Sequence, residues 1–101
     1  GDFALVAAAA QVALDAEGRC LRASFGLAGG GSIPMAFPAL AAQLVGTAMN
    51  DTAIDEVANH AVSAFDPGGD LHASPGYRRQ LAAVLAARML RAARDEARAC
   101  Q

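Results

Sequence analysis

The sequence predicts an α+β fold in which an antiparallel sheet of about three strands is covered on one face by three helices. Two observations carry this prediction. Residues 3–14 are apolar, residues 19–28 alternate between apolar and other side chains, and a glycine-containing turn joins the two segments. Beyond residue 50, two segments repeat apolar residues at the three- and four-residue steps of a helix. Strands first and helices afterwards are typical of this class.

The first two segments are expected to form a β-hairpin. Within residues 3–14 periodicity alone leaves strand and helix open, and the many alanines favour helix. The neighbouring segment decides the assignment, because residues 15–18 have turn chemistry and residues 19–28 alternate like a half-buried strand. The alternation predicts an inner face of Leu21, Ala23, Phe25 and Leu27, and an outer face of Cys20, Arg22 and Ser24.

A glycine-rich loop and a short strand follow the hairpin. Residues 29–32 read Gly-Gly-Gly-Ser, but no G-x-G-x-x-G pattern runs through these glycines, and the chain has no lysine for a phosphate-binding loop. We therefore expect a flexible connection in place of a phosphate cradle. Residues 33–37 are expected to form a third strand, which Pro34 directs to the edge of the sheet.

Two shorter helices are expected next. Pro38 can open a helix that continues to Val45, and Gly46 can close it in a left-handed conformation. Residues 50–52 offer caps for another helix, with Thr52 and Asp55 at the spacing of a capping box. The apolar face expected for this helix consists of Ile54, Val57, Ala58, Ala61, Val62 and Phe65.

The last helix is expected to begin with Ser74 as its cap and Pro75 as its first residue. Its apolar residues recur at helical steps and predict a buried stripe of Tyr77, Leu81, Val84, Leu85, Met89 and Ala92. Its charged residues predict a solvated face of Arg88, Arg91, Asp95 and Arg98.

Length and composition predict one small domain over residues 1–101, with a core too small to enclose a large cofactor by itself. The net charge is −2, and residues 78–101 hold six arginines against two acids, whereas residues 1–77 hold two against eight. Arginines interspersed with acids along a helix are a poor phosphate track, so nucleic-acid binding is not expected. No segment reaches membrane-spanning length, and two distant cysteines indicate a reduced, cytoplasmic protein.

No catalytic residue and no metal ligand is predicted from the motifs. His60 falls on the polar side of its helix, and His72 lies in a loop where it can bond locally to the backbone. The serines stand in no nucleophile motif. Cys20 has Arg19 and Arg22 beside it, which would permit a lowered thiol pKa without establishing one. From the residues alone, the chain is a packing or docking domain.

The two ends of the chain carry a more specific signal. The opening Gly1–Val6 and a late pattern resemble the start and the end of the C-terminal domain of the flavoprotein (medium) subunit of molybdenum hydroxylases, the carbon monoxide dehydrogenase and xanthine dehydrogenase family. The late pattern consists of Asp70, Ala73, Ser74, Tyr77, Arg78, Arg79, Leu81, Val84 and Leu85. Leu44 and Gly46 also fit the family, whereas Ala36 and Ala41 stand where its arginine and glutamate are usual.

The resemblance implies a CO dehydrogenase flavoprotein C-terminal domain-like fold, and a chain that is a fragment of a longer FAD-binding subunit. FAD would be held by two upstream domains, with none expected on this chain alone. The partners implied are a molybdopterin large subunit and a [2Fe-2S] small subunit, whose electrons reach an acceptor through FAD. Asp2, Phe3 and Ala4 would lie nearest the flavin, although a strand start with a capping acid is the favoured explanation of these residues.

Two other hypotheses remain open. One is a stand-alone dimerisation or protein-interaction module, because the C-terminal dimerisation domains of flavin disulfide reductases resemble the predicted architecture. The other is a small hydrolase with a catalytic triad assembled only in space. An uncovered hydrophobic face would favour docking, and a cluster of serine, histidine and aspartate would favour hydrolysis.

Overall fold

The computed structural model describes residues 6–29, 34–64 and 75–100. The elements in chain order are β1 (Val6–Leu14), β2 (Cys20–Gly29), β3 (Met35–Ala36), α1 (Pro38–Ala42), α2 (Asp51–Ala64) and α3 (Pro75–Ala99). The three strands form one antiparallel sheet in the order β1-β2-β3. The predicted α+β class and the predicted hairpin are therefore confirmed.

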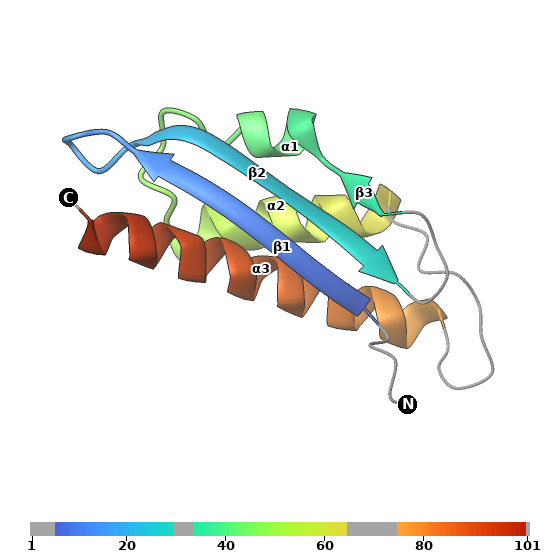
Figure 1. Ribbon diagram of the computed structural model, residues 1–101. Coiled ribbons are helices and arrows are strands. Elements are labelled where there is room, and N and C mark those ends of the chain that lie inside the picture. Colours follow the sequence, from blue (N-terminus) through green and yellow to red (C-terminus); the bar gives the residue numbers. More distant parts are fainter. Residues whose placement is uncertain (1–5, 30–33, 65–74, 101) are drawn as a thin grey trace.

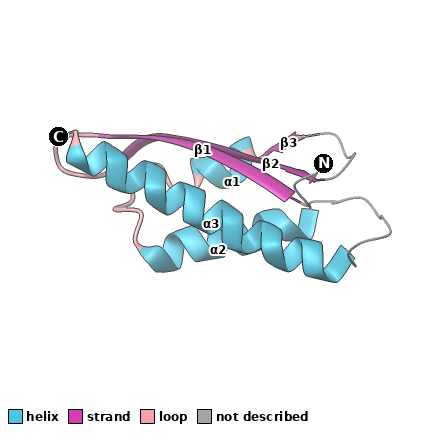
Figure 2. Cartoon of the chain, turned by 60° about the horizontal axis from the view of Figure 1, so that its bottom comes forward, coloured by secondary structure: helices cyan, strands magenta, loops and turns pink. Residues whose placement is uncertain are grey.

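The molecule is two layers thick, and the helices lie on one side of the sheet only (Figure 2). The longest helix, α3, runs along β1, and α2 lies beside α3 in the opposite direction (Figure 1). The short α1 packs against β2. The opposite face of the sheet has none of the described elements over it.

The core fills the space between the sheet and the helices. Its fully buried large side chains come from every layer and are Leu27, Leu44, Met49, Ile54 and Leu90. Phe25 of β2 stacks on Phe37 just before α1, with ring centroids 5.4 Å apart. Alanines occupy much of the remaining core, so the helices and the sheet approach one another closely.

Asp15 organises the turn between β1 and β2. Its Oδ1 accepts hydrogen bonds from the backbone N–H groups of Glu17 (2.8 Å) and Arg19 (2.9 Å). Gly18 adopts φ +84°, a conformation that residues with a Cβ rarely take. The predicted turn chemistry is therefore present at these positions.

The predicted orientation of the side chains is wrong for the first two residues of β2, Cys20 and Leu21. Cys20 is 2% exposed and Leu21 is 57% exposed, the reverse of the expectation. The register of the hairpin shifts between Ala13, which pairs with Arg22, and Leu14, which pairs with Cys20. Leu21 is the extra residue of a β-bulge, so strict alternation does not extend past it.

The caps and lengths of the middle elements differ in detail from the prediction. The strand expected over residues 33–37 is short, with Met35–Ala36 as β3, and α1 ends at Ala42, while Gly46 has the predicted left-handed φ of +83°. The side chain of Asn50 caps α2 by accepting from the N–H of Ala53 at 2.8 Å. This bond replaces the predicted capping box of Thr52 and Asp55. The α2 face is confirmed over Ile54, Val57, Ala58 and Ala61, with Val62 half-buried.

The buried stripe predicted for α3 is displaced around the helix. Tyr77 and Val84 are 53% and 46% exposed, and Ala92 is exposed too. Among the α3 residues whose burial is described, the buried ones are Ala82, Ala86, Ala87, Leu90 and Arg94. Because α3 lies between β1 and α2, its smallest residues occupy the closest contacts, and Leu81, Leu85 and Met89 lie half-buried at the flanks. Pro75 is the first helical residue as predicted, whereas Ser74 and Phe65 lie outside the described residues.

Candidate functional site

The uncovered side of the sheet is a regular surface to which all three strands contribute. Strand pairing places nine residues on it, which we call the open sheet face. They form the cross-strand rows Ala7 with Ala28, Ala9 with Gly26 and Ala36, Gln11 with Ser24, and Ala13 with Arg22. Each of the nine is exposed or half-buried. The rows nearest β3 contain only alanine and glycine, and the polar side chains gather toward the hairpin turn.

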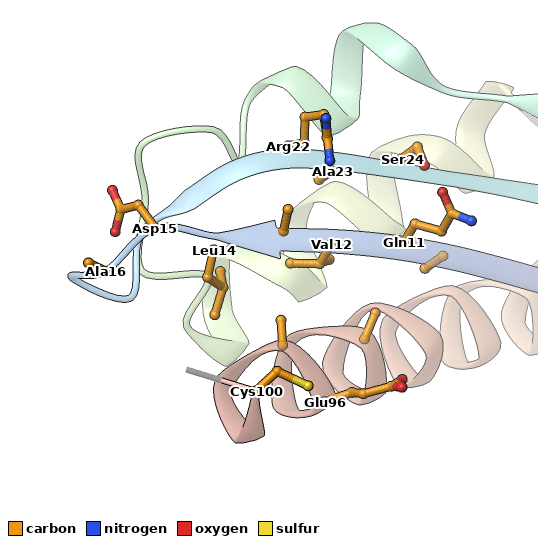
Figure 3. Close-up of a pocket in the computed structure, with 14 residues that line it drawn as sticks. Gln11, Val12, Leu14, Asp15, Ala16, Arg22, Ala23, Ser24, Glu96 and Cys100 are labelled. Atoms are coloured by element: carbon orange, nitrogen blue, oxygen red, sulfur yellow. The ribbon is translucent and has the colours of Figure 1, made fainter.

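A hollow wraps around the edge of β1 near the hairpin turn (Figure 3). Gln11, Arg22 and Ser24 point away from α3, whereas Val12 and Leu14 point toward it (Figure 3). The helical side of the hollow is lined by Ala93, Glu96 and Ala97 of α3 and by Cys100, which directly follows that helix. The hollow is therefore an open edge of the sheet and not an enclosed active-site cavity.

A loop over residues 44–50 passes under this same end of the sheet. The backbone N–H of Cys20 donates to the carbonyl of Thr47, and the N–H of Gly46 donates to the carbonyl of Cys20, both at 2.8 Å. Arg19 donates from Nη1 to the carbonyl of Gly46 at 3.0 Å. The loop is therefore hydrogen-bonded to the start of β2, next to the hairpin turn.

Arg94 fastens the loop to α3. This buried residue, 7% exposed, donates from Nη1 to the carbonyl of Met49 (2.9 Å) and to Oδ1 of Asp51 (2.8 Å). Its Nε donates to Oδ1 of Asp95 at 2.9 Å. Arg98 adds a bond from Nη2 to the carbonyl of Ala48 at 3.2 Å. The sequence prediction missed Arg94, because an arginine among alanines on a helix resembles a solvated residue until its partners are known.

Met49 shows why the loop needs this fastening. It is fully buried and has φ +53°, a left-handed conformation that is unfavourable for a residue with a long side chain. Its N–H donates to Oγ1 of Thr47 at 3.1 Å, and its carbonyl accepts from Arg94. The hydrogen bonds on both sides of Met49 therefore hold a backbone conformation that it would otherwise avoid.

Charge in this network shifts two pKa values. The hydrogen bond from Arg94 lowers the pKa of Asp51 below its ordinary value of 3.8. Burial alone would lower the pKa of Arg94, but its hydrogen bonds to Asp51 and Asp95 outweigh that effect and raise it. Both groups are therefore charged throughout the neutral range, and the network acts as a structural clamp.

Cys20 does not have an activated thiol. Burial raises the pKa of this thiol above 9.0, more than offsetting the N–H of Arg22, which lowers it. The arginines beside Cys20 in the sequence therefore do not produce the lowered pKa that their proximity would permit. Cys100 is exposed at the end of α3.

The other candidate residues are accounted for as follows. His60 is exposed on α2, as predicted. His72 and the flavin-proximal candidates Asp2, Phe3 and Ala4 lie outside the described residues. Among the residues that the structure does describe, no three acidic, histidine or cysteine side chains gather as a metal site, and no helix is long and apolar enough to cross a membrane.

The hollow does not fit the requirements of the FAD diphosphate. A diphosphate is favoured by helix N-termini and by clustered backbone N–H groups. The hollow instead meets the C-terminal end of α3, where the helix dipole is negative and Glu96 adds a negative charge. Arg22 is the single cation among its lining residues. The geometry thus defines an α+β domain whose described parts include an open sheet face, a clamped loop and a hollow with unfavourable electrostatics for a diphosphate.

Comparisons with known proteins agree with this class. Residues 1–93 match the model of the CO dehydrogenase flavoprotein C-terminal domain family. The chain is 34% identical over 98 residues to the 6-hydroxypseudooxynicotine dehydrogenase complex subunit alpha of Paenarthrobacter nicotinovorans, covering 97% of this chain and 33% of that protein. It is 33% identical over 98 residues to the carbon monoxide dehydrogenase medium chain of Afipia carboxidovorans, covering 97% and 34%.

A comparison of the fold with solved structures indicates the same family. A crystal structure of the Cu,Mo-CO dehydrogenase in its cyanide-inactivated form superposes with a TM-score of 0.83 at 30% sequence identity, covering 94% of this chain and 33% of that one. The chain belongs to the CO dehydrogenase flavoprotein C-terminal domain family, which confirms the resemblance found in the sequence. It spans about a third of the length of the curated relatives that it matches.

Proposed function

We propose that residues 1–101 form the C-terminal packing and docking domain of the FAD-containing medium subunit of a molybdenum hydroxylase. In this role the domain performs no chemistry itself. It supports the subunit through which electrons pass from [2Fe-2S] clusters to FAD and on to an acceptor. The observation that carries the proposal is the family match over residues 1–93, which coincides with a compact α+β domain.

The chemistry of the described side chains supports a non-catalytic role. Cys20 is buried with a raised pKa, and the charged residues Arg94 and Asp51 are committed to holding a loop. FAD would be bound mainly by other parts of the subunit, since the hollow beside α3 has the wrong electrostatics for its diphosphate. When bound there, the flavin supplies the electron transfer, and this domain contributes packing.

The partners proposed are the upstream FAD-binding domains, a molybdopterin large subunit and a [2Fe-2S] small subunit. The names of the relatives support partners in general, because one is a subunit of a dehydrogenase complex and the other is a medium chain. A cytoplasmic location is part of the same proposal. Asp2, Phe3 and Ala4 come just before β1 and stay predicted as the residues nearest the flavin.

Purification of the native assembly tests the proposal. The complete gene product that contains this sequence, tagged in its source cells, should be recovered with flavin absorption, iron-sulfur absorption and molybdenum in one complex. Absorption spectroscopy and metal analysis would measure all three. Recovery as a concentration-dependent homodimer that lacks them would contradict the proposal and favour a stand-alone dimerisation module.

The electron-transfer role needs a second measurement on that assembly. Mixing it with a substrate found by screening aromatic heterocycles and carbon monoxide should bleach the iron-sulfur and flavin absorption in turn. An external acceptor should then restore the absorption. An assembly that contains all three cofactors, but whose flavin stays oxidised while its clusters are reduced, would refute the proposed electron path.

A further inference from the structure

The open sheet face is unusual for a surface that meets water. Antiparallel sheets with one solvated face normally place polar side chains on it. Here the outward residues of β1 are Ala7, Ala9, Gln11 and Ala13. Ala28 of β2 and Ala36 of β3 lie on the same face. Alanine and glycine are also poor strand formers, so strand stability does not explain them. Small residues at these positions instead permit another backbone to approach the sheet closely.

Charge is distributed unevenly between the two sides of the molecule. The nine residues of the open sheet face include a single charged one, Arg22. The helical side exposes many more charges, among them Asp55, Glu56, Arg79, Arg88, Asp95 and Glu96. The helices therefore have the composition of a solvated surface, and the sheet has the composition of a covered one.

The edge of the sheet also has the composition of a covered surface. β1 is an edge strand, because the strand order is β1-β2-β3. Exposed edges are usually protected by charged residues or proline, and Val6–Leu14 contains neither. Its bulge lies at the hairpin end, between Ala13 and Leu14, and leaves the rest of the strand regular. Within the described residues, an edge without charges or proline lies beside a face with one charge, which indicates that both are covered in the working protein.

The size of the face limits what can cover it. β1 has nine residues, so the face measures roughly 30 Å along the strand and about 10–15 Å across, or on the order of 350 Å². A stable association between separate proteins usually buries about 800 Å² on each partner. A dimer of this chain through the open sheet face alone falls short of that area. Domains of one polypeptide pack through smaller interfaces, because the chain already holds them together.

From these observations we infer that the open sheet face and the edge of β1 dock against the flavin-binding portion of the same subunit, leaving the helices toward solvent or other subunits. This inference rests on the proposed function. The relatives' chains are about three times as long as this one, which leaves ample polypeptide to supply such a portion. A second copy of this chain is the competing occupant.

Thiol labelling of the complete medium subunit tests the inference. Exposed Cys100 is first replaced by serine, and a new cysteine is then introduced as Ala9→Cys on the open sheet face or as Asn59→Cys on exposed α2. Buried Cys20 stays as it is. Each variant reacts with a maleimide in the native and the denatured state, and the ratio of the two rates measures protection.

We expect the cysteine at position 9 to react at least tenfold more slowly than the one at position 59 in the native subunit, independently of protein concentration. Equal rates in a subunit that retains one FAD would overturn the inference while leaving the proposed function intact. Protection that disappears on dilution would identify a second copy as the occupant and also overturn it. A subunit without flavin, or a gene with no flavin-binding portion, would instead remove the proposed function and the inference together.

A charge introduced on the face gives a second readout. Ala9→Arg should lower the thermal midpoint of flavin release from the complete subunit, because its side chain cannot be accommodated in a close sheet contact. Asn59→Arg is the matched control, since it adds the same side chain to an exposed position on the other side. Equal midpoints for the two variants would contradict docking through the open sheet face.

Discussion

Replacing Arg94 with methionine tests the clamp that holds the 44–50 loop. The substitution keeps an apolar stem of similar length and removes three hydrogen bonds, to the Met49 carbonyl, Asp51 and Asp95. Leaving the carbonyl of fully buried Met49 without a partner costs about 1–3 kcal/mol. Asp51 has a side chain that is 69% exposed, so solvent screens its pairing with Arg94 and the Met49 carbonyl dominates the loss. We therefore expect a loss of about 1–3 kcal/mol.

Urea unfolding followed by circular dichroism measures this loss, and thermal unfolding should show a midpoint lowered by about 5–20 °C for a domain of this size. Arg88→Met is the matched control, because Arg88 is an exposed arginine on the same helix. It should change stability by less than about 0.5 kcal/mol. Arg94→Lys should recover part of the loss, since one ammonium cannot reproduce the directions of two guanidinium nitrogens. If Arg94→Met were as stable as Arg88→Met, the proposed stabilisation of the loop by Arg94 would be refuted.

Three further predictions concern the core, the sheet and pH. Leu90→Ala should destabilise the protein by about 2–5 kcal/mol in the same urea assay, because Leu90 is fully buried, and a cost under 1 kcal/mol would contradict its place in the core. Gly26→Ala should cost about 1–3 kcal/mol, since the added Cβ would lie 2.9 Å from the carbonyl oxygen of Met35, and an unchanged unfolding midpoint would refute that contact. Because the folded pKa of Asp51 lies below 3.8, the stability that it contributes is complete above about pH 5 and is lost as pH falls through the lowered pKa. Between pH 6 and pH 2, the free energy of unfolding should therefore fall more steeply in the native chain than in Asp51→Asn. Parallel curves would show that the pair with Arg94 has no effect on stability.

The sequence was sufficient for the order of elements and for the features that depend on neighbouring residues. The turn at Asp15 and Gly18, the proline at the start of α3 and the left-handed Gly46 all arise from local backbone chemistry. The α2 face was also predictable, because its apolar residues at helical spacing meet one packed layer. Local propensity and tertiary packing agree at these positions.

The remaining features depend on contacts between distant segments. Leu21 is turned outward by a bulge, which alternation cannot reveal. The buried side of α3 follows from its position between β1 and α2, where alanines such as Ala82 and Ala86 fit more closely than the larger residues around them. Arg94 is buried only because a loop 45 residues earlier in the chain supplies its acceptor. None of these partners can be identified from sequence spacing.

The candidate site also has features that the sequence predicts and features that it does not. The family was recognisable from short motifs, and the match over residues 1–93 confirms it. The sequence predicted helices on one face of the sheet and placed Arg22 and Ser24 on the other, but the alanines of residues 3–14 gave no indication of which of them complete the open sheet face. Strand register and the one-sided placement of the helices were needed to define it (Figure 2).

The flavin content of two purified proteins tests the central claim most directly. One is the 101-residue chain, and the other is the complete medium subunit that contains it. After dialysis against FAD-free buffer, the subunit should retain about one FAD per polypeptide by its absorption spectrum, and the chain should retain none. A chain that kept a stoichiometric flavin by itself would show that it is a flavoprotein in its own right and not a packing domain.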